Sequence, residues 1–416
     1  MKTTLSRLPN HVRVATCEMP HAQSVTMGIW TEVGGRYEPA KWSGISHFIE
    51  HLLFKGTARR SARQISQAVE GVGGYLNAFT AEEHTCYHAA AAAEYAPKVF
   101  DVLADMYLHA RFASQDIERE RGVISEEILM YRDEPAQLVQ EILSETIWPA
   151  HALGRPLTGS LQSVARMQRE DFVEFRRRHY HGGSTLVTMA GRITHEAAEQ
   201  LAQPLADLPL NRRTAPATAP ASTDAPRWSV LAKATEQTQL ALAFPAFSVH
   251  DERRHALGLL HTILGGNMSS RLFQELRERR GLCYSVGTHL VPFSDTGALV
   301  VSCGLDAKSL EKTMDILRRE WAKLRTIPVS RQELQRAKDY TIGMSRMSLE
   351  KTSSQNARLG FSVLTYGKIT DSEEIHERIR SVSIEAITEV AAEILQEDRL
   401  TTAIVGPVDE AVVRQL

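Results

Sequence analysis

Apolar residues recur along this chain with two alternating periods, one typical of strands and the other typical of amphipathic helices. The first half opens with predicted strands, and a helical run, a pair of strands and a further helix follow. These predicted elements are strands Val12–Cys17 and Ser24–Val33, a helical run from Ser43 to about Val72, strands Tyr75–Thr80 and Thr85–Ala93, and helix Glu94–Ala110. The succession predicts a mixed α+β domain.

A similar succession returns in the second half at an offset of about 210 residues, with Gly74 matched by Gly281 and Glu94 by Asp306. Its predicted elements are strand Gln239–Phe244, helices Arg253–Leu264 and Ser270–Arg279, strands Cys283–His289 and Ala298–Cys303, and helix Ala307–Leu324. We interpret this as an internal duplication that gives two α/β-sandwich domains, each an antiparallel or mixed sheet with helices packed on one side. Two unrelated α+β domains are the alternative.

The remaining segments have mostly helical periodicity. They are Gln115–Tyr131, Ala136–Ile147, Arg169–Arg178, Ala197–Leu208, Ser330–Met347, Glu350–Tyr366 and Ile384–Leu395. Several helices are preceded by a residue that can cap their first turn, as at Ser43, Ser114 and Ser330.

One stretch, Arg212–Arg227, is rich in Pro, Ala, Ser and Thr and has no apolar periodicity. It predicts an exposed linker, and a long surface loop within one domain is the alternative. The predicted division is therefore a domain over residues 1–211, a linker over 212–227 and a second domain over 228–416.

The composition is that of a globular protein, with 43% hydrophobic and 24% charged residues among 416. A net charge of −2 removes the simplest argument for binding nucleic acid. Four cysteines lie far apart without a CxxC pair, which favours a reducing compartment. No apolar signal-peptide core and no run of membrane-spanning length occur, so we expect a cytoplasmic protein without a membrane partner.

The segment His47-Phe48-Ile49-Glu50-His51 carries the first candidate chemistry. Residues four apart share one face of a helix, so both imidazoles can reach one ion, and Glu50 lies close to that face. Two imidazoles beside a carboxylate suit zinc-assisted hydrolysis, with Glu50 as the general base for a water. Two histidines that merely share a helix are the alternative.

A catalytic zinc needs a third protein ligand and one open position. Glu120 and Glu127 are seven residues apart in IERERGVISEEILMYRDEP, and therefore lie on one helical face. Glu127 can complete the site, and Glu120 is placed to orient a histidine ligand from outside it. Taken alone, either residue would be interpreted as part of a solvated helix face.

These residues together resemble the pitrilysin or insulinase family of zinc metallopeptidases, in which an inverted H-x-x-E-H motif precedes a glutamate ligand. Glu127 follows His51 by 76 residues, which is the spacing of that family. Further matches are GGYLNAFTAEEHTCYH and ERERGVISEEI, both typical of the subfamily that contains mitochondrial processing peptidase, and SSRLFQELRERRGLCYSVG. The resemblance covers nearly the whole chain.

The resemblance implies roles for single residues. It implies that His47, His51 and Glu127 bind one zinc ion per chain, with Glu50 as base and Glu120 as the outer carboxylate. It also implies that an edge strand at Asn77 and Ala78 pairs with an extended substrate. In the second half, which has no such motif, Arg277 and Tyr284 match a pair that would bind the substrate carbonyl and the developing oxyanion.

The expected function is that of a zinc-dependent metalloendopeptidase acting on peptides or unfolded polypeptide segments. The resemblance implies that a chain of 416 residues with two repeats needs a second copy or a homologue to enclose a peptide, giving a clam-like homodimer or a heterodimer, because some family members carry four repeats in one chain. One alternative is a processing-protease subunit that is active only with a homologous partner. The other is a non-catalytic scaffold subunit, which the intact motif argues against.

Overall fold

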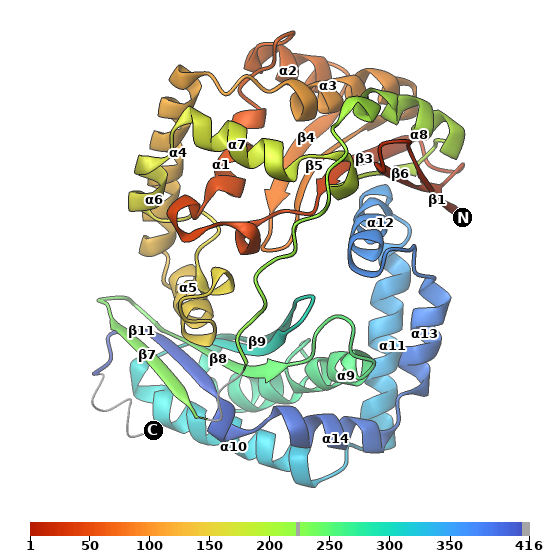
Figure 1. The fold of residues 1–416 in the computed structure, drawn as a ribbon. Helices are drawn as coiled ribbons and strands as arrows, with labels where there is room; N and C mark the ends of the chain where they lie inside the picture. The colour runs from red at the N-terminus through yellow and green to blue at the C-terminus, as the bar shows by residue number, and fades with distance from the viewer. Residues whose placement is uncertain (222–224, 410–416) are drawn as a thin grey trace. The chain divides into compact units, whose positions relative to one another are not determined.

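The computed structural model describes residues 1–221 and 225–409, and the chain forms two compact units (Figure 1). Unit 1 contains Met1–Ile128, Pro156–Ala217 and Arg346–Thr370, and unit 2 contains Leu129–Arg155, Thr218–Ser345 and the described residues from Asp371 on. Each unit is therefore assembled from separate stretches of the chain.

Unit 1 is built on a six-stranded mixed sheet in the order β1-β2-β6-β3-β5-β4. The strands are β1 (Lys2–Arg7), β2 (Arg13–Glu18), β3 (Ser24–Thr31), β4 (Tyr75–Thr80), β5 (Thr85–Ala92) and β6 (Thr185–Gly191). β2 and β6 run parallel, and all the other neighbouring pairs are antiparallel. β4 is the last strand at one side of this sheet.

Most helices of unit 1 cover one face of its sheet. They are α1 (Ile45–Leu53), α2 (Ala62–Glu70), α3 (Ala96–His109), α4 (Ser114–Asp133), α6 (Leu161–Arg166), α7 (Arg169–His179) and α8 (His195–Ala202). Alternate strand residues such as Val25, Met27 and Ile29 form a core with Phe48 of α1 and Phe100 of α3. These residues share one face because successive side chains of a strand point to opposite sides of the sheet.

Unit 2 repeats this architecture with a five-stranded sheet in the order β7-β11-β8-β10-β9. The strands are β7 (Arg227–Ala232), β8 (Thr238–Ala246), β9 (Cys283–Pro292), β10 (Gly297–Leu305) and β11 (Thr401–Gly406). β7 and β11 run parallel, as β2 and β6 do, and the remaining pairs are antiparallel. With β1 left aside, the two sheets have the same strand order, which confirms the duplicated α+β fold.

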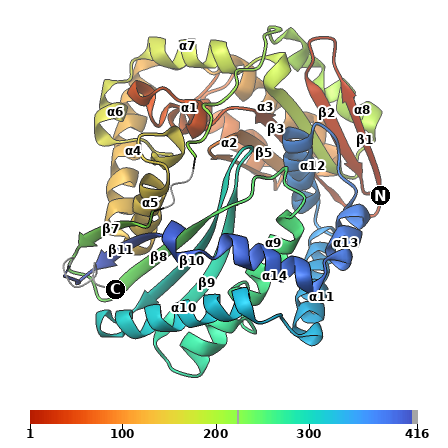
Figure 2. The ribbon, with the colours of Figure 1, turned by 60° about the horizontal axis from the view of Figure 1, so that its bottom comes forward.

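The helices of unit 2 are α5 (Pro135–Ile147), α9 (Arg254–Leu264), α10 (Leu310–Thr326), α11 (Arg331–Ser348), α13 (Ser372–Ser381) and α14 (Ile384–Ile394). α9, α10, α11 and α14 pack with one face of the sheet around Phe244 and Trp321 (Figure 2). Within the described part of the chain, no helix has the length and apolarity needed to cross a membrane. The four cysteines are free thiols and are all buried.

The second face of each sheet is covered by a helix from the other half of the sequence. In unit 1, α12 (Thr352–Tyr366) places Leu359 and Val363 against Trp30 and Leu186. Asn356 fixes this helix by donating through Nδ2 to the carbonyl oxygens of Thr26 (3.0 Å) and Thr188 (2.9 Å). In unit 2, α5 covers the corresponding face around Ala241, Ala243 and Val405 through its residues Val139 and Leu143.

The compact units therefore differ from the predicted division at residues 211 and 228 by these two exchanged helices. The segment predicted as a linker has no helix or strand before β7 in its described residues, and residues 222–224 lie outside them. Its first part contacts unit 1, because Arg36 donates to the carbonyl of Ala217 and Arg213 pairs with Glu32 at 2.9 Å.

Several predicted elements differ in extent. The helical run predicted from Ser43 to Val72 is two helices, α1 and α2, separated by a turn at Gly56, whose φ is +125°. The helix predicted over Ser270–Arg279 contains a π-helical segment over Phe273–Glu278. The sequence patterns also did not predict strands β1, β6, β7 and β11 or helices α6 and α13.

The packing of α12, from the second half of the sequence, against the sheet of unit 1 can be tested by mutation. A Cβ added at Gly360 would lie 2.3 Å from two atoms of the Trp30 indole. We expect Gly360→Ala to destabilise the protein by roughly 1–2 kcal/mol, because the steric cost exceeds the helix-propensity gain of alanine. Gly343→Ala in α11 is the control, since nothing lies within 4 Å of its added Cβ. Urea denaturation should show opposite shifts, and stabilisation by both changes would contradict this packing.

Candidate metal centre

The helix that carries the histidine motif is α1. Its apolar residues Ile45, Phe48, Ile49 and Leu52 are buried, so the opposite positions His47, Glu50 and His51 remain half-buried at its side. The predicted cap at Ser43 is wrong, because the N-cap residue is Gly44 and no side chain caps from that position. Instead, the buried Glu38 carboxylate accepts hydrogen bonds from the backbone N–H groups of Gly44 (2.7 Å) and Ser46 (2.8 Å). This carboxylate satisfies free N–H groups at the positive end of the helix.

The structure brings His47, His51 and Glu127 together. Oε2 of Glu127, on α4, lies 3.7 Å from Nε2 of His47 and 3.7 Å from Nε2 of His51. The three ligand atoms all lie within 4.8 Å of one another. Among the residues that the structure describes, these three form the only such group of potential metal ligands.

The donor set fits zinc. Two imidazole nitrogens and one carboxylate oxygen are a usual three-ligand set for a catalytic zinc. Tetrahedral ligands about 2.1 Å from zinc lie roughly 3.4 Å apart, close to the observed separations between Glu127 and each histidine. Burial and the neighbouring His51 lower the pKa of His47 to about 4. His47 is therefore neutral near pH 7, as a metal ligand must be.

Glu120 lies behind this group, and its side chain is only 6% exposed. Its Oε2 accepts from Nδ1 of His51 at 3.1 Å, which leaves Nε2 of His51 as the unprotonated nitrogen facing Glu127. Its Oε1 lies 2.8 Å from Nζ of Lys55. Burial raises the pKa of Glu120, but the hydrogen bonds from His51 and Lys55 outweigh burial and hold it below its usual value. Glu120 is therefore an ionised acceptor for His51.

Glu50 lies beside the same group, and Oε2 of Glu50 accepts a 2.5 Å hydrogen bond from Oγ1 of Thr80 at the end of β4. Burial raises the pKa of Glu50, although the bond from Thr80 and the nearby His51 oppose the shift. A carboxylate whose pKa is moved toward neutrality is better suited to accept and return a proton.

Asn77 and Ala78 lie on β4, where they pair with His88 and Tyr87 of β5. As the last strand of the sheet, β4 has its other side turned away from β5. The backbone N–H of Ala78 donates to the Oδ1 atom of Asn77 at 2.8 Å. The predicted substrate-binding residues therefore lie on an edge strand that is joined to Glu50 through Thr80.

Arg277 and Tyr284 belong to unit 2, whereas the candidate metal ligands His47, His51 and Glu127 belong to unit 1. The guanidinium of Arg277 lies 4.8 Å from the ring centroid of Phe273 and 5.0 Å from that of Tyr284. Arg277 is carried by the π-helical segment, a local irregularity that is frequent at functional sites. The structure thus brings the two predicted residues together, with Tyr284 76% exposed.

Three residues around the centre were not predicted from the sequence: Glu38, which caps α1, Lys55, which contacts Glu120, and Thr80, which contacts Glu50. Lys55 had a usable signal, because it follows His51 by four residues and so extends the same helical face. Glu38 and Thr80 had none, because their contacts are made between separate elements.

Comparison with known proteins supports these assignments of fold and family. The model of the insulinase family (peptidase family M16) matches residues 13–160, and that of the peptidase M16 inactive domain matches residues 166–340. An uncharacterized zinc protease of Streptomyces coelicolor is 36% identical and aligns over 97% of this chain and 89% of its own. The uncharacterized zinc protease YmxG of Bacillus subtilis is 33% identical, over 96% of this chain and 97% of its own.

Solved structures have the same fold. A protease from Helicobacter pylori superposes with a TM-score of 0.91 at 20% identity, covering 98% of this chain and 99% of that one. A structure described as a peptidase M16 inactive domain from Pseudomonas fluorescens has a TM-score of 0.91 at 18% identity, with the same coverage.

Proposed function

The chain belongs to the insulinase family, peptidase family M16, and on that premise we propose that it is a zinc-dependent endopeptidase acting on peptides and unfolded polypeptide segments. The observation that carries the proposal is the convergence of His47, His51 and Glu127 beside Glu50. The intact group also argues against a scaffold subunit without a metal.

His47, His51 and Glu127 would hold one zinc ion per chain. Bound zinc would act as a Lewis acid toward the scissile carbonyl and the attacking water. Thr80 occupies Oε2 of Glu50, so Oε1 would take the proton from that water and later return it to the leaving amine. Glu120 would hold the His51 ring in orientation through Nδ1.

The substrate would bind as an added strand along β4. In this mode, backbone groups of an extended peptide pair with the edge of the sheet, and the N–H of Ala78 would exchange its bond to Asn77 for a peptide carbonyl. Main-chain pairing requires an unfolded segment and places few demands on its side chains. Arg277 and Tyr284 would donate to the substrate carbonyl, where negative charge develops.

We further propose that the working enzyme is a homodimer that encloses the peptide in a chamber. A heterodimer with a homologous subunit is the other possible assembly. Cleavage by the chain purified alone, with its mass measured in solution, distinguishes a self-sufficient enzyme from a subunit that needs a different partner.

The direct test is metal analysis of the purified chain together with cleavage of a quenched peptide library, with and without a chelator. We expect about one zinc per chain, cleavage within peptides, and loss of cleavage when zinc is removed. Cleavage that persists in the metal-free protein, or a chain that binds no zinc, would overturn the proposed function.

The third ligand can be tested separately. We expect Glu127→Gln to weaken zinc binding by roughly a hundredfold, because a neutral amide replaces a charged ligand. Loss of a residue that only supports a ligand typically costs about 10- to 100-fold, so loss of the ligand itself should reach the upper end of that range. Glu126→Gln, an exposed neighbour on α4, is the matched control and should bind zinc as the wild type does. Competition with a chromophoric chelator measures both affinities. Equal zinc affinity in the two variants would show that Glu127 is not a ligand.

A further inference from the structure

Lys55 lies just beyond the end of α1, in the turn between α1 and α2. The backbone N–H of Phe54 donates to the carbonyl of His51 (3.2 Å), and that of Lys55 donates to the carbonyl of Leu52 (3.1 Å). These bonds continue the helix for part of a turn. Lys55 is thereby kept on the same side as His51.

His51 and Lys55 each contact a different oxygen of the Glu120 carboxylate. Oε2 of Glu120 accepts a hydrogen bond from Nδ1 of His51 at 3.1 Å, and Oε1 lies 2.8 Å from Nζ of Lys55. A carboxylate bonded at both oxygens by groups from one segment has a fixed position and a fixed plane. The ammonium also supplies the opposite charge that a carboxylate this deeply buried requires.

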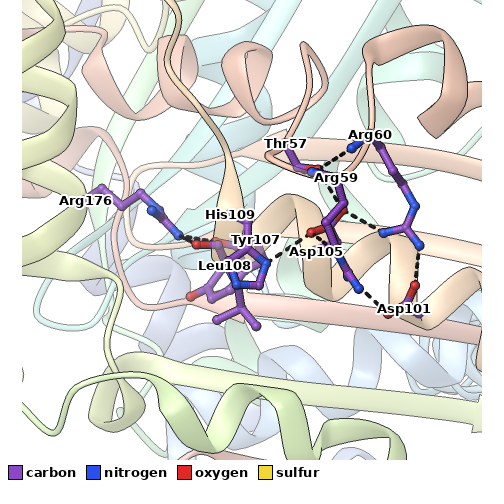
Figure 3. A network of polar contacts seen from close by, with 9 residues as sticks. All are labelled: Thr57, Arg59, Arg60, Asp101, Asp105, Tyr107, Leu108, His109 and Arg176. Atoms are coloured by element: carbon purple, nitrogen blue, oxygen red, sulfur yellow. Dashed lines mark hydrogen bonds and ion pairs between the residues drawn. The ribbon is translucent and has the colours of Figure 1, made fainter.

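The backbone that follows Lys55 is anchored to α3 rather than left as a free loop (Figure 3). Oγ1 of Thr57 donates to Oδ2 of Asp105 at 2.7 Å and accepts from the backbone N–H groups of Arg59 (3.1 Å) and Arg60 (2.9 Å). The N–H of Arg111 donates to the carbonyl of Gly56 at 3.2 Å. The residue directly after Lys55 is therefore held by the segment that follows α3.

Asp105 is the centre of this anchor and is fully buried. Besides Thr57, it accepts from Nε of Arg59 (2.9 Å) and Nη1 of Arg60 (2.6 Å), and both arginines also pair with Asp101. A buried carboxylate with several charge-assisted bonds is a strong local constraint. These contacts restrict the position of the Lys55 backbone, and this favours the contact of its side chain with Glu120.

We propose that Lys55 is a positioning residue of the metal centre: its ammonium fixes Glu120 at Oε1 so that Oε2 orients His51 toward the metal. This inference rests on the proposed zinc-binding function of His51. Without the ammonium, Glu120 keeps His51 as its only side-chain partner among the residues that the structure describes, and rotation of its carboxylate releases the His51 ring. The expected consequence is weaker zinc binding in a protein that is otherwise folded.

The test compares Lys55→Met with Lys55→Arg and with Lys98→Met, an exposed lysine on α3 that serves as the control. Zinc dissociation constants come from competition with a chromophoric chelator, and thermal unfolding of the metal-free proteins reports folding. We expect Lys55→Met to weaken zinc binding roughly tenfold, in the range for outer partners. Lys55→Arg should recover most of the affinity because it restores the charge, and Lys98→Met should bind as the wild type does.

A double-mutant cycle identifies the route of the effect. If Lys55 acts through Glu120, Lys55→Met should cost almost nothing further in a Glu120→Gln background, so the two losses are strongly non-additive. A general loss of packing would lower affinity additively and would also lower the melting temperature of the metal-free protein.

The outcomes separate this inference from the proposed function. Zinc binding by the wild type that Glu127→Gln weakens as expected, together with unchanged affinity in Lys55→Met, would overturn the role of Lys55 and leave the zinc site standing. A tenfold loss that is additive with Glu120→Gln, or that Lys55→Arg does not reverse, would also overturn it. Failure of the wild type to bind zinc would remove the proposed function itself.

Discussion

Glu50→Gln is expected to lower peptide hydrolysis by about 10²–10⁴-fold while zinc remains bound. His47, His51 and Glu127 are untouched by this change, so the metal-binding group persists. The amide retains the shape of the side chain and can still contact Thr80, but it cannot take a proton from water. Single-turnover cleavage of a quenched peptide, with metal analysis of the same sample, measures both properties.

Glu70→Gln is the matched control, because this residue is an exposed carboxylate at the end of α2. It should leave both zinc content and cleavage at wild-type levels. Near-normal turnover in Glu50→Gln would reject Glu50 as the base, and zinc loss in that variant would show that its role is to hold the metal.

The second large effect is expected in unit 2. Arg277→Ala and Tyr284→Phe should each lower kcat/KM by about 10²–10³, because each would remove a proposed donor to the oxygen on which negative charge develops. Zinc content should not change, since neither residue belongs to the metal-binding group. The hydroxyl of the largely exposed Tyr284 contributes little to packing, so the melting temperature should also stay near that of the wild type.

Arg279→Ala is the control for the arginine. Its side chain is 67% exposed, directly follows the π-helical segment and pairs with Glu275. Measurement of kcat/KM on one peptide for all variants gives the comparison. Unchanged values in both Arg277→Ala and Tyr284→Phe would show that these residues take no part in hydrolysis.

The sequence predicted some residues of the candidate metal centre more directly than others. The four-residue spacing of His47 and His51 brings two imidazoles together on any helix, and the structure has that helix. Glu127 could be selected only through the family resemblance, because nothing local separates it from other acidic residues of α4. Glu38 and Thr80 were missed because their contacts are made between separate elements, whereas the four-residue spacing of Lys55 from His51 was a signal that went unused.

The fold was also predictable in part. Strand Tyr75–Thr80 was predicted with its observed bounds, and most other predicted strands agree to within a few residues. β6 and β11 were missed because both are buried along their whole length and lack the alternation of a half-buried strand. The apolar faces of α5 and α12 predict that each helix packs on something, but periodicity does not name the partner. Local sequence patterns therefore could not predict that each of these helices packs on the sheet of the other half.

That exchange has a consequence for synthesis on the ribosome. All six strands of unit 1 have been made once Gly191 is added, but the helix that covers their second face ends at Tyr366. At about 5–20 residues per second, the nascent chain waits roughly 10–35 s with that apolar face uncovered. The uncovered residues include Ala15, Cys17, Trp30, Cys86 and Leu186. We expect the growing polypeptide to need chaperones during this interval, and its solubility to depend on how quickly translation reaches α12.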